Sequence, residues 1–181
     1  MDNRIIPFTY SPNPDKKRVY PALFGALAVG SVLTVMSVSV ERFRGLISLG
    51  AVLFLGAAMF FFVRYVGQEF VYNVDMNSND EPMLVISKVI GKRISTMCAI
   101  PLYSIISIQK FTKTTGRYVP NKKIKRHNFV ATFGADSIFV IKSETRYDKC
   151  EIVIECTDEM AARLNQYVEI AKEIEKESGE E

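Results

Sequence analysis

Two apolar stretches near the N-terminus decide the fold of this chain: YPALFGALAVGSVLTVMSVSV at residues 20–40 and LISLGAVLFLGAAMFFFV at residues 46–63. Neither stretch contains an acidic or basic side chain. Because a helix rises about 1.5 Å per residue, about 20 apolar residues cross the ~30 Å hydrocarbon core of a bilayer. The intervening ERFRG, residues 41–45, allows only a tight antiparallel turn. The pattern therefore predicts a transmembrane helical hairpin within residues 20–66.

The basic residues around the hairpin predict its orientation. Arg4, Lys16, Lys17 and Arg18 precede the first stretch and Arg64 follows the second, while the connecting turn holds two arginines. Since cytoplasmic flanks carry an excess of Lys and Arg, this balance favours both chain ends in the cytoplasm. Three cysteines without a CxxC spacing suit a reducing compartment. A cleaved signal peptide is disfavoured, because the first stretch is too long and the second follows at once.

Small residues recur along both apolar stretches. Ala22, Ala26 and Gly30 are spaced four residues apart in the first, and Gly50 lies in the second. Because small residues let helix backbones approach closely in lipid, these four positions are predicted helix-packing sites. We favour packing of the two spans against each other; the alternative is an interface with a second copy or another membrane protein.

After residue 67 the apolar period changes from helical to alternating, which predicts about seven antiparallel strands. The expected strands are residues 68–74, 83–89, 93–100, 102–111, 129–133, 137–142 and 150–156. In the last of these, Cys150, Ile152 and Ile154 are expected to face a core, whereas Glu151 and Val153 face away from it.

An amphipathic helix is expected to close the chain. Thr157 can cap its N-terminus, and Asp158 and Glu159 suit the positive end of its dipole. Its apolar positions recur at helical spacing: Met160, Leu164, Tyr167, Val168, Ala171 and Ile174. Such a helix can close the open end of a bent sheet or of two packed sheets.

The expected organisation has four parts. These are a basic N-terminal segment (1–19), the hairpin (20–66), an all-β barrel or sandwich capped by the C-terminal helix (67–176), and an acidic tail (177–181).

Three short stretches of the β-rich region carry a family likeness. They are FVYNV at 70–74, LVI at 84–86 leading into IGKR at 90–93, and IPLYSI at 100–105. With the hairpin before them, they resemble the bacterial pleckstrin-homology-like membrane proteins. The resemblance implies a pleckstrin-homology-like fold and a multi-pass location in a bacterial plasma membrane, rather than an activity.

One departure from pleckstrin-homology domains that bind phosphoinositides concerns the first hairpin loop. This loop, DMNSNDEP at residues 75–82, has three carboxylates and no basic residue. Because the carboxylates would repel a phosphorylated headgroup, phosphoinositide binding is not expected.

The most distinctive polar segment is a basic stretch at residues 110–127 that contains no acid. Its lysines and arginines are the candidate lipid- or partner-binding residues: Lys110, Lys113, Arg117, Lys122, Lys123, Lys125 and Arg126. Near a cytoplasmic leaflet each cation gains roughly 1 kcal/mol from anionic lipid, so acidic headgroups are one expected ligand. The alternatives are a solvated loop without a ligand and a protein partner; nucleic acid is not expected.

Catalytic and cofactor motifs are missing from the sequence. His127 is the only histidine, the cysteines lack zinc spacing, and no glycine-rich phosphate loop occurs. An enzyme would need paired titratable groups in a cleft or a polar cluster in the membrane. We therefore expect no enzyme activity, no metal site and no cofactor.

The sequence thus favours a non-enzymatic membrane protein that presents a cytoplasmic binding or scaffold domain. The alternative is an accessory subunit of a larger membrane complex, for transport, export or immunity, that acts through the hairpin. The expected partners are membrane lipids, a membrane or cytoplasmic protein, or a second copy of the chain.

Overall fold

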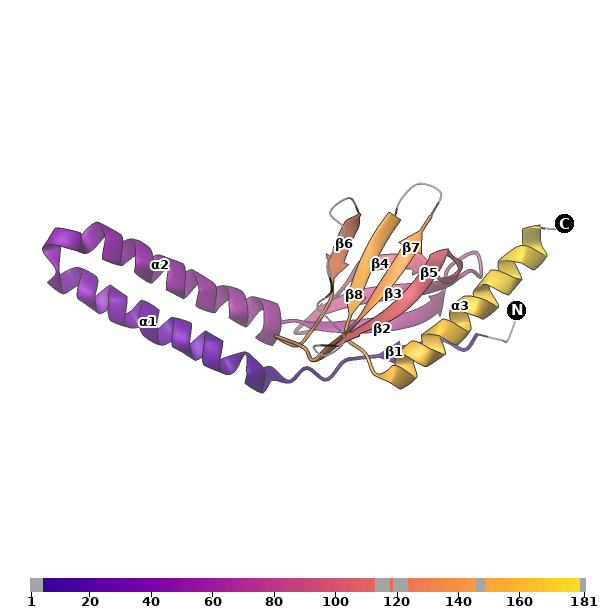
Figure 1. Ribbon diagram of the computed structural model, residues 1–181, viewed down its shortest axis with the longest axis horizontal. Helices are drawn as coiled ribbons and strands as arrows, with labels where there is room; N and C mark the ends of the chain where they lie inside the picture. Colours follow the sequence, from indigo (N-terminus) through magenta and orange to yellow (C-terminus); the bar gives the residue numbers. More distant parts are fainter. Residues whose placement is uncertain (1–4, 113–117, 119–123, 146–148, 180–181) are drawn as a thin grey trace. The chain divides into compact units, whose positions relative to one another are not determined.

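The computed structural model describes residues 5–112, 118, 124–145 and 149–179 (Figure 1). The chain forms two compact units. A helical unit comprises residues 14–69 and 132–134, and a β-rich unit comprises residues 1–13, 70–131 and 135–181.

The helical unit is built on an antiparallel pair of long helices. Its elements are η1 (Lys16–Arg18), α1 (Tyr20–Ser39), η2 (Glu41–Phe43), α2 (Arg44–Phe61) and η3 (Phe62–Val66), a π-helical turn. Pro21 lies in the first turn of α1, where its missing N–H breaks no helical hydrogen bond. Both helices are long and apolar enough to cross a membrane. The two predicted helices are therefore confirmed as elements.

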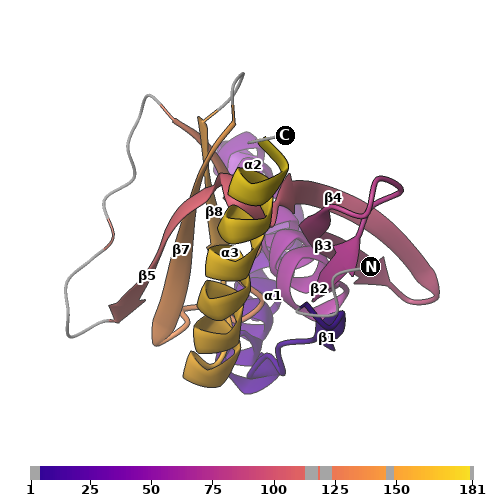
Figure 2. The same cartoon turned by 90° about the vertical axis from the view of Figure 1, so that its right-hand side faces the viewer.

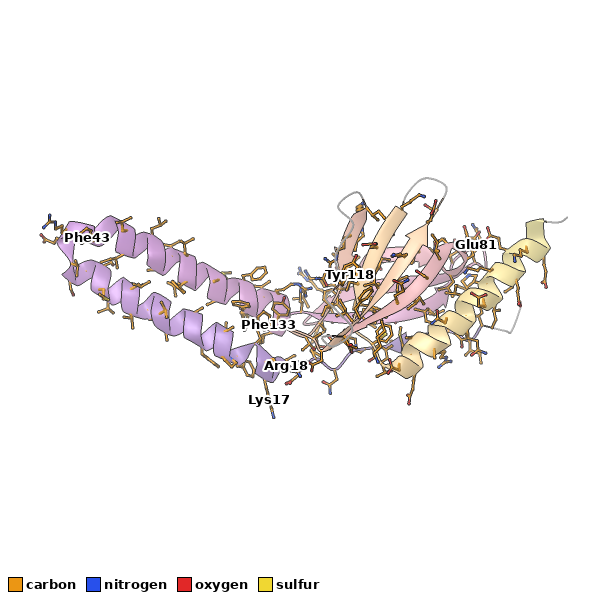
Figure 3. The ribbon with its side chains drawn as sticks, in the orientation of Figure 1. Lys17, Arg18, Phe43, Glu81, Tyr118 and Phe133 are labelled. Carbon is orange, nitrogen blue, oxygen red and sulfur yellow. The ribbon has the colours of Figure 1, made fainter. Side chains whose placement is uncertain are left out.

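One end of the helical unit holds residues 132–134, which come from a later part of the chain. The ring of Phe133 contacts Phe61 and Tyr65 edge-on, with centroids 5.4 and 5.3 Å apart. The Arg18 guanidinium donates a hydrogen bond to the Gly134 carbonyl at 3.3 Å. Figure 3 shows Arg18 and Phe133 at this end of the unit, and Phe43 at the turn between the helices.

The first sheet of the β-rich unit has the order β1-β2-β3-β4. Its strands are β1 (Phe8–Tyr10), β2 (Glu69–Met76), β3 (Pro82–Ile90) and β4 (Arg93–Pro101). β1 precedes the helices in the chain, yet it pairs antiparallel with β2, with Tyr10 opposite Tyr72. Gly91 turns β3 into β4 at φ +58°, a conformation that glycine adopts without steric cost.

The second sheet has the order β5-β7-β8-β6. Its strands are β5 (Ile105–Thr112), β6 (Lys125–Asn128), β7 (Ser137–Glu144) and β8 (Lys149–Ile154). β5, β7 and β8 are antiparallel neighbours, whereas β6 runs parallel to β8 at the edge. A 3-10 turn, η4 (Leu102–Ser104), links the two sheets after Pro101.

The helix α3 (Asp158–Gly179) completes the core of the β-rich unit. It starts as predicted, because the Thr157 hydroxyl accepts a hydrogen bond from the Met160 N–H at 3.2 Å. Figure 2 looks onto α3, with the strands of one sheet on each side of it. The core combines residues of both sheets with the apolar stripe of the helix, and its fully buried members include Tyr72, Leu84, Ile86, Leu102, Ile105, Ile141, Ile152, Ile154 and Leu164.

Two sequence expectations differ from the observed strands. Residues 129–133 were expected to form a strand in a hairpin with residues 137–142, but they are irregular, and the strand before β7 is the polar β6. Phe129 and Ala131 are nevertheless buried in the core, which explains the alternating pattern. The second difference is β1, which lies in the segment expected to stand apart as residues 1–19.

Candidate functional site

Three charged residues stand side by side on one face of the second sheet. Arg126 on β6 lies opposite Glu151 on β8, and Lys142 on β7 lies opposite Glu151 from the other side. Because directly opposite residues project to the same face of a sheet, the carboxylate has a cation on each flank. This face points away from the core, to which Ile152 and Ile154 belong.

A tyrosine covers this carboxylate. The Tyr118 hydroxyl donates a hydrogen bond to Glu151, which is only 3% exposed. The Arg126 guanidinium lies 4.8 Å from the centroid of the Tyr118 ring, and the Phe111 ring meets that ring edge-on at 5.2 Å. We call Phe111, Tyr118, Arg126 and Glu151 the Tyr118 cluster.

The electrostatics of the Tyr118 cluster favour a structural role over a reactive one. Burial and the neighbouring Glu151 raise the pKa of the Tyr118 phenol to about 12, against a smaller opposing effect of Arg126. At neutral pH the phenol is therefore a protonated donor and not a base or nucleophile. The cluster fixes Tyr118 of the basic stretch to the second sheet.

The described members of the predicted binding set fall into two groups. Lys125 and Arg126 are exposed on β6. Lys110 lies on β5, and its ammonium is 2.6 Å from both carboxylate oxygens of Asp158 at the start of α3. An exposed ion pair of this kind contributes roughly 0–1 kcal/mol, but it engages the cation within the β-rich unit. The other four predicted residues, Lys113, Arg117, Lys122 and Lys123, lie outside the described residues.

Two of the four predicted helix-packing residues, Gly30 and Gly50, lie at the contact between α1 and α2. A Cβ at Gly30 would lie 2.9 Å from the side chain of Leu55, so only glycine fits this approach without a shift. A Cβ at Gly50 would lie 3.4 Å from Leu33, an ordinary contact. Ala22 and Ala26 are half-buried on α1.

Two of the cysteines, Cys98 and Cys156, show no sign of activation. Burial raises the pKa of the Cys156 thiol to about 12, and it also raises the pKa of the Cys98 thiol. A protonated thiol is a poor nucleophile and a poor metal ligand. Within the described part of the chain, no group of three His, Cys, Asp or Glu residues is arranged to hold a metal ion.

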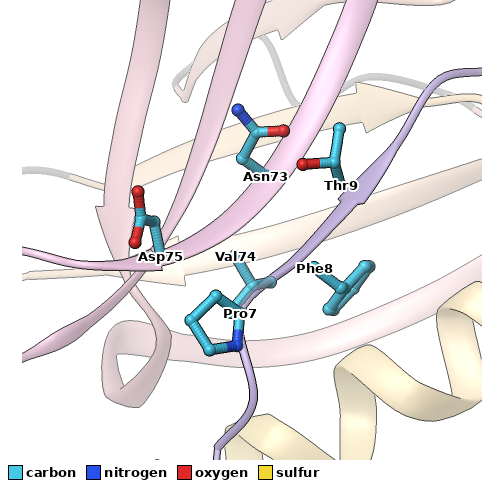
Figure 4. A pocket seen from close by; sticks show the side chains of 6 residues that line it. All are labelled: Pro7, Phe8, Thr9, Asn73, Val74 and Asp75. Carbon is cyan, nitrogen blue, oxygen red and sulfur yellow. The ribbon is translucent and has the colours of Figure 1, made fainter.

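One surface cavity of about 230 Å³ lies over β1 and β2 (Figure 4). It is lined by Pro7, Phe8, Thr9, Asn73, Val74 and Asp75. The Asn73 side-chain oxygen is buried and has no hydrogen-bond partner among the described residues. The lining has one carboxylate and no cation, so its charge does not favour an anionic ligand.

No family model, curated protein or solved structure matches this chain. Sequence reasoning missed the Tyr118 cluster, because the alternation along β8 placed Glu151 on the face away from the core and thus in solvent. Val153 lies on the same face of β8 as Glu151, and it is also fully buried. Its apolar side chain is the sequence feature which indicates that another part of the chain covers this face. The sequence contains no other feature that would have predicted the cover over Glu151.

Proposed function

We propose that this chain is a non-enzymatic membrane protein whose helical hairpin crosses the plasma membrane and whose β-rich unit acts as a pleckstrin-homology-like binding module on the cytoplasmic side. The β-rich unit supports this through its two sheets and its C-terminal helix. The pleckstrin-homology-like fold and the location in the plasma membrane are both part of the proposal.

The observation that carries the proposal is the pairing of β1 with β2. β1 precedes α1 and β2 follows η3, yet Phe8 lies opposite Val74 and Tyr10 opposite Tyr72 in one sheet. Tyr167 on α3 also donates a hydrogen bond to the Ile6 carbonyl at 3.2 Å. Because β1 and β2 pair in one sheet, both strands must lie on the same side of the membrane. A chain that crosses the bilayer twice between them meets this condition. A single crossing or a cleaved first helix would separate the two strands.

The surface of the helices supports insertion into lipid. Only 17% and 11% of their apolar windows are buried, whereas the core helices of soluble proteins are mostly buried. Val35 and Leu46, for example, are 69% and 70% exposed. Exposed apolar surface in water costs about 25 cal/mol per Å², and the hydrocarbon core removes that cost.

A basic segment of the β-rich unit supports an acidic ligand. Residues 82–135 contain ten lysines and arginines and no Asp or Glu. Lys125 and Arg126 are exposed on the edge strand β6 of this region. Anionic headgroups attract such cations, so the proposed ligand is the acidic surface of the leaflet beside the hairpin.

The test is a topology measurement on the full-length protein in sealed membrane vesicles. With an epitope tag at each end, protease should remove both tags from inside-out vesicles and neither tag from right-side-out vesicles. Alkaline carbonate should leave the protein in the membrane pellet. Tags on opposite sides, or release by carbonate, would overturn the proposal.

The alternative function, an accessory subunit that acts through the hairpin, draws less support. Gly30 and Gly50 are the predicted helix-packing glycines, and both face the neighbouring helix within the hairpin. Purification in mild detergent separates the two functions, since a subunit would carry a stoichiometric integral partner.

A further inference from the structure

We propose that the tip of the β3–β4 hairpin, residues 88–97, is a second membrane-contact element that inserts into the headgroup region of an anionic leaflet. The inference rests on the proposed function, because it requires the helices to be in a bilayer. It concerns a different surface from the basic stretch at residues 110–127.

The tip combines exposed apolar and exposed basic side chains. Ile90, Ile94 and Met97 are 48%, 72% and 49% exposed, although most of the strand residues that face the core are buried. Lys92 and Arg93 are exposed between the two isoleucines. The nearest acid in the sequence before the tip is Glu81, and none follows until Asp136. Apolar side chains flanked by Lys and Arg are typical of elements that lie in the membrane interface.

The register of the hairpin places apolar side chains on both of its faces. Ile90 lies opposite Arg93, and Val89 lies opposite Ile94. Because opposite residues share a face and neighbouring residues alternate, Ile90 and Ile94 project to opposite sides of the tip. A partner protein that packs on one face would leave the other isoleucine exposed. Insertion end-on into an interface covers both, which favours a lipid surface as the occupant.

The tip also lies at the end of the first sheet where β2 begins, directly after the helices in the chain. β2 and β3 are neighbours joined by a five-residue turn, so they must be antiparallel. Glu81 marks that turn, at the opposite end of the strands from the tip (Figure 3). β2 begins at Glu69, three residues after Val66, and three residues span at most about 11 Å. The chain from the helices therefore enters the sheet at the end that carries the tip.

The absence of tryptophan from this chain allows a direct test. In full-length protein reconstituted into vesicles of phosphatidylglycerol and brominated phosphatidylcholine, we expect the fluorescence of an Ile94→Trp reporter to be quenched. An Asn79→Trp reporter, in the exposed turn at the other end of the sheet, should not be quenched. Ile90→Trp gives an independent second reporter at the tip.

The charge contribution is tested with matched variants. Lys92→Gln with Arg93→Gln should abolish quenching of the Ile94→Trp reporter, as should replacing phosphatidylglycerol with phosphatidylcholine. Lys172→Gln with Lys176→Gln removes the same charge from α3 and should change nothing. Quenching that survives loss of the two tip cations would overturn the assignment to an anionic leaflet.

A Phe54→Trp reporter in α2 separates this inference from the proposed function. If Phe54→Trp is quenched while Ile94→Trp and Ile90→Trp are not, the hairpin is inserted and the tip inference is wrong. That result would leave the exposed edge strand β4 as a surface for an added peptide strand. If Phe54→Trp itself is not quenched, the proposed membrane anchoring is wrong and the inference fails with it.

Discussion

At the scale of single residues, the buried carboxylate of Glu151 makes the Tyr118 hydroxyl important for stability. Tyr118→Phe removes the hydrogen bond to a carboxylate that is 3% exposed. Leaving a buried acceptor without its donor costs about 1–3 kcal/mol, so we expect a lower melting temperature for the full-length protein in detergent. Tyr103→Phe is the matched control, because the Tyr103 hydroxyl makes no hydrogen bond within the described residues. Equal melting temperatures for the two variants would contradict the role of the Tyr118 cluster.

The same residue predicts a pH dependence at alkaline pH. The pKa of Tyr118 is raised to about 12 in the folded chain, above an unfolded value of about 10. A raised pKa means that its stabilisation is fully present below pH 10 and is lost as pH rises through about 12. The difference in melting temperature between the wild-type protein and Tyr118→Phe should therefore shrink between pH 10 and pH 12. A constant difference across this range would show that the phenol does not titrate with the stated pKa.

At the scale of elements, the approach of α1 to α2 depends on Gly30. A leucine there would overlap Leu55, and overpacking of this kind typically costs about 1–3 kcal/mol. Gly30→Leu should lower the melting temperature of the hairpin in mild detergent, followed by far-UV circular dichroism. Gly25→Leu should not, because nothing lies within 4 Å of a Cβ at Gly25. Combining Gly30→Leu with Leu55→Ala should restore most of the lost melting temperature. If it does not, the destabilisation by Gly30→Leu does not come from overlap with Leu55.

The elements also show how far the sequence could predict the fold. α1 and α2 follow from their long apolar runs, β3 and α3 from apolar periods that match their burial, and β4, β7 and β8 from apolar stretches bounded by turns. Residues 129–133 do not, because alternation reports burial and not strand pairing. Phe129 is buried, but its carbonyl accepts a hydrogen bond from the Tyr72 hydroxyl at 2.9 Å, and Phe133 contacts the aromatic end of α2. β6 escaped prediction because a polar edge strand parallel to β8 leaves no apolar pattern.

At the scale of the whole molecule, the least predictable feature is that β1 joins a strand 60 residues later in the sequence. Its pairing depends on contacts that no local pattern reports. The Phe8 ring meets the Tyr167 ring edge-on at 5.8 Å, and the Arg163 guanidinium lies 4.6 Å from the Phe8 centroid. These contacts come from α3, at the far end of the chain. β1 is thus a structural part of the β-rich unit, and the helical hairpin is an insertion between β1 and β2.

This organisation predicts that the β-rich unit folds without the hairpin if β1 is kept. In the test protein, residues 1–13 are joined to residues 70–181 by a glycine-serine linker of about four residues, which together with residues 11–13 connects β1 to β2. Phe133→Ser is included, because the helices that cover this ring are gone. We expect a soluble protein with a single cooperative thermal transition.

The control for this prediction is the same protein that begins at residue 70. It lacks β1, the hydrogen bond from Tyr167 to Ile6 and the Phe8 contacts, so it should melt at a lower temperature. Because β1 covers one edge of β2, amide hydrogen exchange along β2 should also be faster in the control. Identical melting and exchange in the two proteins would mean that β1 does not stabilise the sheet. The two chain ends would then no longer need to lie on one side of the membrane.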